Sequence, residues 1–74
     1  MSQAEYRIAL TEREREVLEL IVKGLTSNEI GERLFISPRT ADGHLKKLIS
    51  KFEVRNTMEL IAKAIQDGWV EAPA

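Results

Sequence analysis

The 74-residue chain contains no cysteine, and its only histidine, His44, has no partner for a metal site or a catalytic triad. Without cysteine, neither a disulfide framework nor a thiolate metal site can form. No apolar run approaches the roughly 18 residues that a membrane span needs. No secretion signal is expected, because the first residues show no charged segment followed by an apolar one. These absences argue against an enzyme, a cofactor or metal site and a membrane partner, and they are compatible with the cytoplasm.

The charged residues are segregated along the chain. A formal net charge of −1 argues at first against a nucleic-acid partner. However, residues 33–55 carry six basic and two acidic side chains, a balance of +4, whereas residues 1–32 and 56–74 balance at −3 and −2. Because binding follows the local potential of a surface, the middle segment is the candidate for contact with phosphates.

Helix caps and apolar periodicity predict an all-α fold of four short helices in one domain. The expected helices cover about residues 12–23, 26–34, 38–53 and 57–67. Their caps are Thr11, Thr26, Ser37 and Asn56. The first two caps are followed three residues later by glutamate, which is the capping-box pattern. The acidic residues from Glu12 to Glu19 are interpreted as compensation of the helix dipole and as solvated surface.

The apolar positions predict the core. They are Tyr6, Ile8, Leu10, Val17, Leu18, Ile21, Val22, Ile30, Leu34, Phe35, Ile36, Ala41, Leu45, Leu48 and Phe52. Gly24 is expected to end the first helix with a left-handed backbone. Gly31, which has no side chain, is expected to allow a close helix crossing.

The second and third helices, separated by residues 35–37, have the outline of a helix-turn-helix, which lays its second helix in the major groove of DNA. At about 100° per residue, the face of helix 38–53 opposite the core is basic and hydroxylated. Its candidate DNA-binding residues are Arg39, Thr40, Asp42, Gly43, Lys46, Lys47, Ser50 and Lys51. The alternative is that this is an ordinary solvated helix face.

Each candidate has an expected role. Lys46 is expected to reach guanine O6 and N7. Phosphate contacts are expected from Arg39, Thr40, Lys47 and Lys51, while Ser50 lies far along the helix and its role stays open. Asp42 either accepts a hydrogen bond from a cytosine amino group or lies at the rim and lowers non-specific affinity, and we favour the rim. Gly43 is either a tolerated flaw in the helix or an aid to close approach, and we favour close approach.

These residues carry a resemblance to a known family. The positions that carry it are Leu10 to Leu18 (LTEREREVL), Gly24, Asn28 to Gly31 (NEIG), Leu34, Ile36, Ser37, Thr40, His44, Lys51, Val54 and Gly68 to Val70 (GWV). In this order and spacing they resemble the LuxR (GerE-type) helix-turn-helix family over roughly residues 10–70. Residues 1–9 would then be a lead-in, and residues 71–74 a tail.

The resemblance implies an output domain of a response regulator in a two-component system, or of an autoinducer receptor, that regulates transcription by binding double-stranded DNA. It also implies a dimer through the fourth helix, for which Met58, Ala62 and Ile65 are the candidate surface. Alternatively, these three residues only close the core. The chain departs from the family pattern at three positions: Ala41 replaces a usual valine, Asp42 a frequent lysine and Thr57 a usual arginine.

Two other functions stay open from the sequence. Region four of bacterial sigma factors has a related helix-turn-helix, although His44 and the separate fourth helix are more similar to the LuxR type. Asp42, Thr57 and the net charge would also suit a protein-interaction module that has lost DNA binding. A patch for RNA polymerase would lie among exposed residues that the sequence does not distinguish from other surface.

Overall fold

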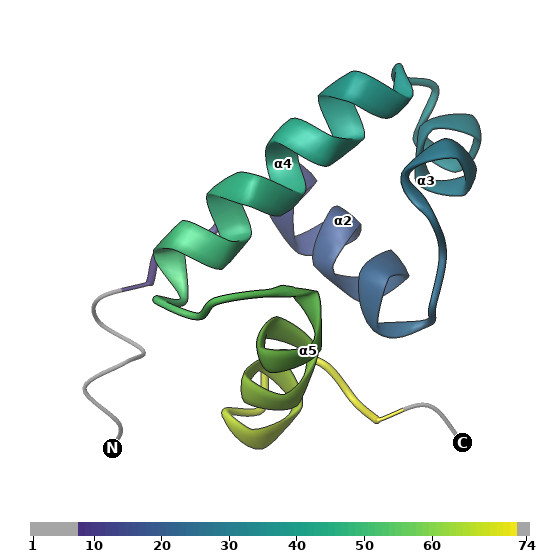
Figure 1. Cartoon of the computed structure of the whole chain (residues 1–74). Helices are drawn as coiled ribbons and strands as arrows, with labels where there is room; N and C mark the ends of the chain where they lie inside the picture. Colours follow the sequence, from purple (N-terminus) through teal and green to yellow (C-terminus); the bar gives the residue numbers. More distant parts are fainter. Residues whose placement is uncertain (1–7, 73–74) are drawn as a thin grey trace.

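The computed structural model describes residues 8–72 and has four helices and no strand in that part of the chain. The helices are α2 (Glu12–Val22), α3 (Ser27–Leu34), α4 (Pro38–Lys51) and α5 (Thr57–Gln66), as Figure 1 shows. The all-α prediction is confirmed. The helix predicted over residues 38–53 is α4, and it ends two residues earlier, at Lys51. Phe52 caps it, and Glu53 takes a left-handed backbone with φ of 56°.

The helices begin where the side-chain caps of the sequence place them. The Thr11 hydroxyl accepts a hydrogen bond from the backbone N–H of Glu14 at 3.1 Å, and the Glu14 carboxylate accepts one from the N–H of Thr11 at 2.9 Å. Thr26 and Glu29 repeat this exchange at the start of α3. Each pair satisfies two backbone donors that a helix start otherwise leaves free.

The turn between α3 and α4 contradicts one prediction. Phe35 was expected in the core, but 94% of its surface is exposed. The chain reverses here through a left-handed backbone at Phe35, with φ of 59°, while the N–H of Ile36 donates to the carbonyl of Gly31 at 2.9 Å. Ile36 packs against the core and Phe35 faces solvent. The turn therefore partly buries one of two adjacent apolar residues and exposes the other.

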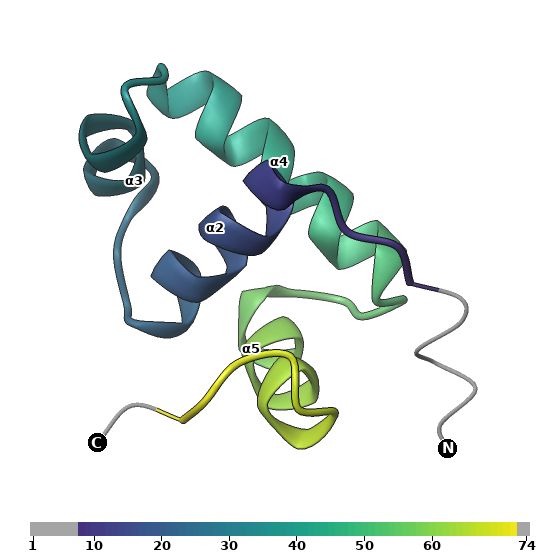
Figure 2. The same ribbon diagram turned by 180° about the vertical axis from the view of Figure 1, so that it is seen from behind.

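The core lies where α2, α4 and α5 meet. In Figures 1 and 2, α4 extends across the molecule, with α3 beside its beginning and α5 near its end. The buried apolar residues are Ile8, Val17, Leu18, Leu20, Ile21, Val22, Ile30, Ala41, Leu48, Phe52, Leu60 and Ala64. Leu10, Leu34 and Leu45 pack against this set, as predicted. Tyr6 lies outside the described residues.

An aromatic contact attaches the segment after α5 to the core. The ring of Trp69 meets that of Phe52 edge to face, with centroids 6.0 Å apart. The guanidinium of Arg15 lies 5.7 Å from the centroid of the Trp69 ring, close enough for a cation–π contact. These contacts join the C-terminal segment to the end of α4 and to α2.

Gly31 is required by the turn between α3 and α4. The prediction that it allows a close crossing of two helices is therefore wrong. A Cβ atom at this position would lie 2.6 Å from the carbonyl oxygen of Ile36 and 3.3 Å from the nitrogen of Pro38. Both atoms belong to the backbone, so neither can rotate away. The missing side chain lets the turn fold back on α3 and directs α4 from its first residue.

We therefore expect Gly31→Ala to lower the free energy of unfolding by about 1–3 kcal/mol through overpacking. The matched control is Gly43→Ala. A Cβ at Gly43, within α4, meets nothing within 4 Å, so alanine should raise stability by up to about 1 kcal/mol through helix propensity. Urea denaturation of both variants measures the two changes. A Gly31→Ala domain as stable as wild type would contradict the backbone constraint.

Candidate nucleic-acid interface

The outward face of α4 brings most of the predicted DNA-binding residues together on an open surface. Arg39, Thr40, Gly43, Lys46, Lys47 and Ser50 are all exposed, and Asp42 is half-exposed. They share one helix, and the core residues Ala41 and Leu48 lie on its other side. The arrangement follows from the helical period, which separates the two sets of side chains.

The first turn of α4 is fixed by its cap. The Ser37 hydroxyl accepts a hydrogen bond from the N–H of Thr40 at 3.0 Å and donates to the Thr40 hydroxyl oxygen at 2.9 Å. The Thr40 hydroxyl keeps its own proton for donation. An exposed hydroxyl at a helix start, with basic side chains beside it, is suited to a phosphate oxygen.

Asp42 and Lys46 form an ion pair one helical turn apart. The Lys46 ammonium lies 3.8 Å from the Asp42 carboxylate; the Lys46 side chain is exposed and that of Asp42 is half-exposed. Exposed pairs at this spacing contribute only about 0.3–0.5 kcal/mol. The pair therefore biases the direction of Lys46, while a stronger acceptor can displace the ammonium at little cost.

Lys51 has partners that the sequence did not reveal. Its ammonium donates to the carboxylate of Glu14 at 2.7 Å and to the carbonyl of Ala9 at 2.8 Å. Glu14 takes the capping role that the sequence predicts. However, it does not belong to a solvated surface, because only 4% of its surface is exposed. A signal was available in the spacing, because Glu14 lies three, four and seven residues before the core residues Val17, Leu18 and Ile21.

Burial raises the pKa of Glu14, but the hydrogen bonds from Lys51 and Thr11 and the charge of Lys51 outweigh burial, so its pKa is lowered overall. At the start of α3, the pKa of Glu29 is also lowered, mainly by its hydrogen bonds with Thr26. Both carboxylates therefore remain charged at neutral pH, and both caps are intact there.

The proposed dimer residues lie along α5. Met58 is 79% exposed and Ala62 is also exposed, whereas Ile65 packs partly against the core. Their spacing of four and then three residues places them on one face. His44 is partly exposed. No cluster of three or more potential metal ligands occurs in residues 8–72, and no helix there is long and apolar enough to cross a membrane.

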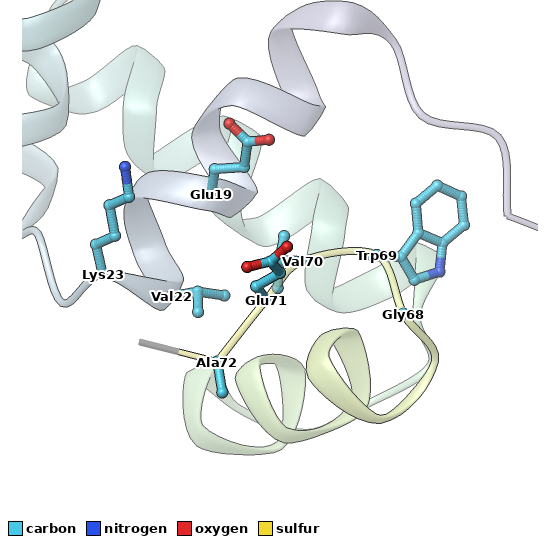
Figure 3. Close-up of a pocket in the computed structure, with 8 residues that line it drawn as sticks. All are labelled: Glu19, Val22, Lys23, Gly68, Trp69, Val70, Glu71 and Ala72. Atoms are coloured by element: carbon cyan, nitrogen blue, oxygen red, sulfur yellow. The ribbon is translucent and has the colours of Figure 1, made fainter. Parts of the chain in front are cut away.

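Figure 3 shows a hollow elsewhere, between the end of α2 and the C-terminal segment. It is lined by Glu19 and Val22 from α2, by Lys23, which caps the end of α2, and by residues 68–72. The ring of Trp69 points away from it. No residue of α4 lines it. The hollow thus belongs to a different surface from the basic face of α4.

A short helix, a tight turn and a second helix with a basic outward face define a helix-turn-helix domain. The sequence model of the family described as "Bacterial regulatory proteins, luxR family" matches residues 8–64. The chain belongs to this family, a family of transcription regulators rather than of enzymes. The match decides against a sigma-factor domain.

Individual relatives agree with this family. The chain is 37% identical to the spore germination protein GerE of Bacillus subtilis over 84% of both chains. It is 36% identical to the transcriptional regulatory protein DegU of Brevibacillus brevis over 93% of this chain. DegU is much longer, and the match spans 30% of its length.

Solved structures share the fold. The structure of the transcription factor GerE superposes with a TM-score of 0.78 at 31% identity, over 84% of this chain and 92% of that one. The structure of the Vibrio cholerae VqmA dimer in the absence of target DNA, described in relation to LuxR-type receptors, gives a TM-score of 0.84 at 35% identity. That match covers 93% of this chain and 32% of VqmA.

The lowered pKa of Glu14 predicts a pH dependence of stability. Its stabilisation is complete above the ordinary glutamate pKa and is lost as pH falls through the lowered pKa. We expect Glu14→Gln to lower the free energy of unfolding by about 1–2 kcal/mol at pH 7, and by less as the pH falls through the acidic range. Urea denaturation from pH 7 to pH 3 measures this convergence, with the exposed Glu19→Gln as control. Parallel curves for wild type and Glu14→Gln would contradict it.

Proposed function

We propose that this domain binds double-stranded DNA sequence-specifically to regulate bacterial transcription, with α4 in the major groove. The observation that carries the proposal is the outward face of α4. Arg39, Lys46 and Lys47 are exposed there, directly after the turn, in a chain that belongs to the luxR family. Membership of the family supports this class of function, and the exposed basic residues of α4 are the ones that we propose for it.

The geometry supports a division of roles along this face. Lys46, with 79% of its side chain exposed, extends from the middle of the helix and is suited to guanine O6 and N7. Arg39, Thr40 and Lys47 are assigned to phosphates, which fix the register. Gly43 has open space around it, so its missing side chain is not required by the fold, and we assign it to close approach of α4 to the groove.

Asp42 is assigned to the rim of the interface. Its carboxylate lies beside Lys46 and adds negative charge where phosphates approach, which lowers non-specific affinity. Direct recognition of a cytosine amino group is the alternative, because a carboxylate can accept that hydrogen bond. The rim role would affect all duplexes alike, whereas direct recognition would make the effect of Asp42 depend on the sequence of the bound DNA.

Selection of random duplexes by the purified domain at two salt concentrations tests the proposed function. We expect enrichment of a defined sequence and a steep loss of affinity with salt, because lysine and arginine release counterions from the phosphates. Lys46→Ala should weaken preference at one base pair, by about 1–3 kcal/mol if its contacts are bidentate. No enrichment by the folded domain, together with salt-insensitive binding to a protein, would favour the interaction module.

The same selection separates the alternatives at Asp42 and Gly43. With Asp42→Ala, tighter binding to all duplexes supports the rim, whereas lost preference at one base pair supports direct recognition. With Gly43→Ala, lower affinity from an equally folded domain supports close approach.

A homodimer through α5 is also proposed, supported by the exposed side chain of Met58 and the exposed Ala62. We expect Met58→Asp to keep the fold and to abolish cooperative binding to paired half-sites, because a charge would be buried at the shared face. Ala72→Asp adds the same charge at an exposed position of the C-terminal segment and serves as the control. Gel-shift titrations on one and two half-sites measure cooperativity, and unchanged cooperativity in Met58→Asp would exclude this surface.

The wider setting is proposed on the same basis. A regulator that binds chromosomal DNA acts in the bacterial cytoplasm and can contact RNA polymerase from its exposed surface. The chain spans 30% of the length of DegU and 84% of that of GerE, so it corresponds either to an output domain, as in a response regulator, or to a small regulator. Residues 10–70 are proposed as the DNA-binding unit.

A further inference from the structure

Lys51 differs from the other basic residues of α4 in its direction and its partners. It follows Ser50 by one residue, which rotates it by about 100° from that member of the outward face. Its side chain is 36% exposed, against 79% for Lys46. The sequence assigned all these residues to DNA, but the structure turns Lys51 toward the protein.

The partners of Lys51 join three parts of the chain. Its ammonium donates to the buried carboxylate of Glu14 on α2 and to the backbone carbonyl of Ala9, before α2. Glu14 also accepts the N–H of Thr11. We call Lys51, Glu14 and the Ala9 carbonyl the Lys51 clamp. If Lys51 moved to a phosphate, the Glu14 carboxylate would remain buried with its charge unpaired, which is costly.

We propose that Lys51 is a positioning residue for DNA recognition and does not contact a phosphate. The Lys51 clamp fixes the end of α4 against α2 and residues 9–11, while the turn at Gly31 and Ile36 fixes its beginning. With both ends held, the outward face enters the groove at one angle, and Lys46 reaches a defined base pair. This inference rests on the proposed function, because it concerns how the same face is aimed.

The experiment compares variants of the whole chain on the selected duplex and on a scrambled duplex of equal length, over a range of salt concentrations. Lys51→Met removes the ammonium of the clamp, and Glu14→Gln removes the negative charge that pairs with it. Lys47→Gln removes an exposed lysine that is assigned to a phosphate. Each variant yields a ratio of specific to non-specific affinity and a slope of affinity against salt.

For Lys47→Gln we expect weaker binding to both duplexes and a slope reduced by about one. For Lys51→Met and Glu14→Gln we expect an unchanged slope and a specificity ratio lowered at least about fivefold. This loss corresponds to part of the discrimination that one well-placed base contact provides. Glu14→Gln is the sharper case. It removes a negative charge, which by electrostatics alone would strengthen binding to DNA. The double variant should lose no more specificity than either single variant, because both remove one interaction.

Two results overturn the inference. A slope that falls by about one in Lys51→Met would show a phosphate contact. An unchanged specificity ratio in folded variants would show that the clamp only stabilises the domain. Circular dichroism monitors folding, and if Lys51→Met is unfolded, Glu14→Gln carries the test, because its amide can still accept the N–H of Thr11.

The proposed function fails separately, if wild type itself does not discriminate between the duplexes. The clamp is then tested by amide hydrogen exchange in the free domain. Faster exchange at residues 48–54 in Glu14→Gln than in wild type upholds it, and unchanged exchange overturns it.

Discussion

The Glu14 carboxylate accepts one hydrogen bond from the backbone of Thr11 and another from the ammonium of Lys51, so a single side chain fixes the start of α2 and the end of α4. Its burial would by itself favour the neutral acid, and the surrounding donors reverse that preference. A small all-α domain has few long-range contacts to orient its helices. Here one ionic contact joins residues that are 37 positions apart in the sequence.

The beginning of α4 is held in a different way, by the backbone alone. The turn uses a left-handed residue at Phe35 and a close approach of the Ile36 carbonyl to Gly31. Left-handed backbone is unfavourable for a bulky side chain, and Phe35 also gains nothing from burial. The turn is therefore maintained by its neighbours: Ile36 packs on the core, and Ser37 caps the next helix.

Electrostatics in this domain depends on the separation of charges rather than on their total. Lys46 and Lys47 are exposed on the outward face, with Asp42 beside Lys46, while Lys51 is neutralised by Glu14. The charge that the outward face of α4 presents therefore cannot be read from the net charge of −1 or from the balance of +4 for residues 33–55. A basic residue contributes to a binding face if it is unpaired or if, like Lys46, it has an exposed partner that can be displaced at little cost.

The sequence by itself determined the local features of this protein. Caps at Thr11, Thr26, Ser37 and Asn56 specify where helices begin, because each acts within one turn of chain. The helical period separates the core residues of α4 from its outward face, so the fold class and most of the candidate face could be predicted.

Only the tertiary structure decided the side of the chain on which Phe35 lies, the reason for Gly31, and the partners of Lys51. Each depends on the position of a segment that is distant in the sequence or that follows a reversal of the chain direction. The Ile36 carbonyl approaches Gly31 only after the chain turns back, and Glu14 meets Lys51 only when α2 packs against the end of α4. Periodicity along one helix carries no information about the residues that another element places beside it.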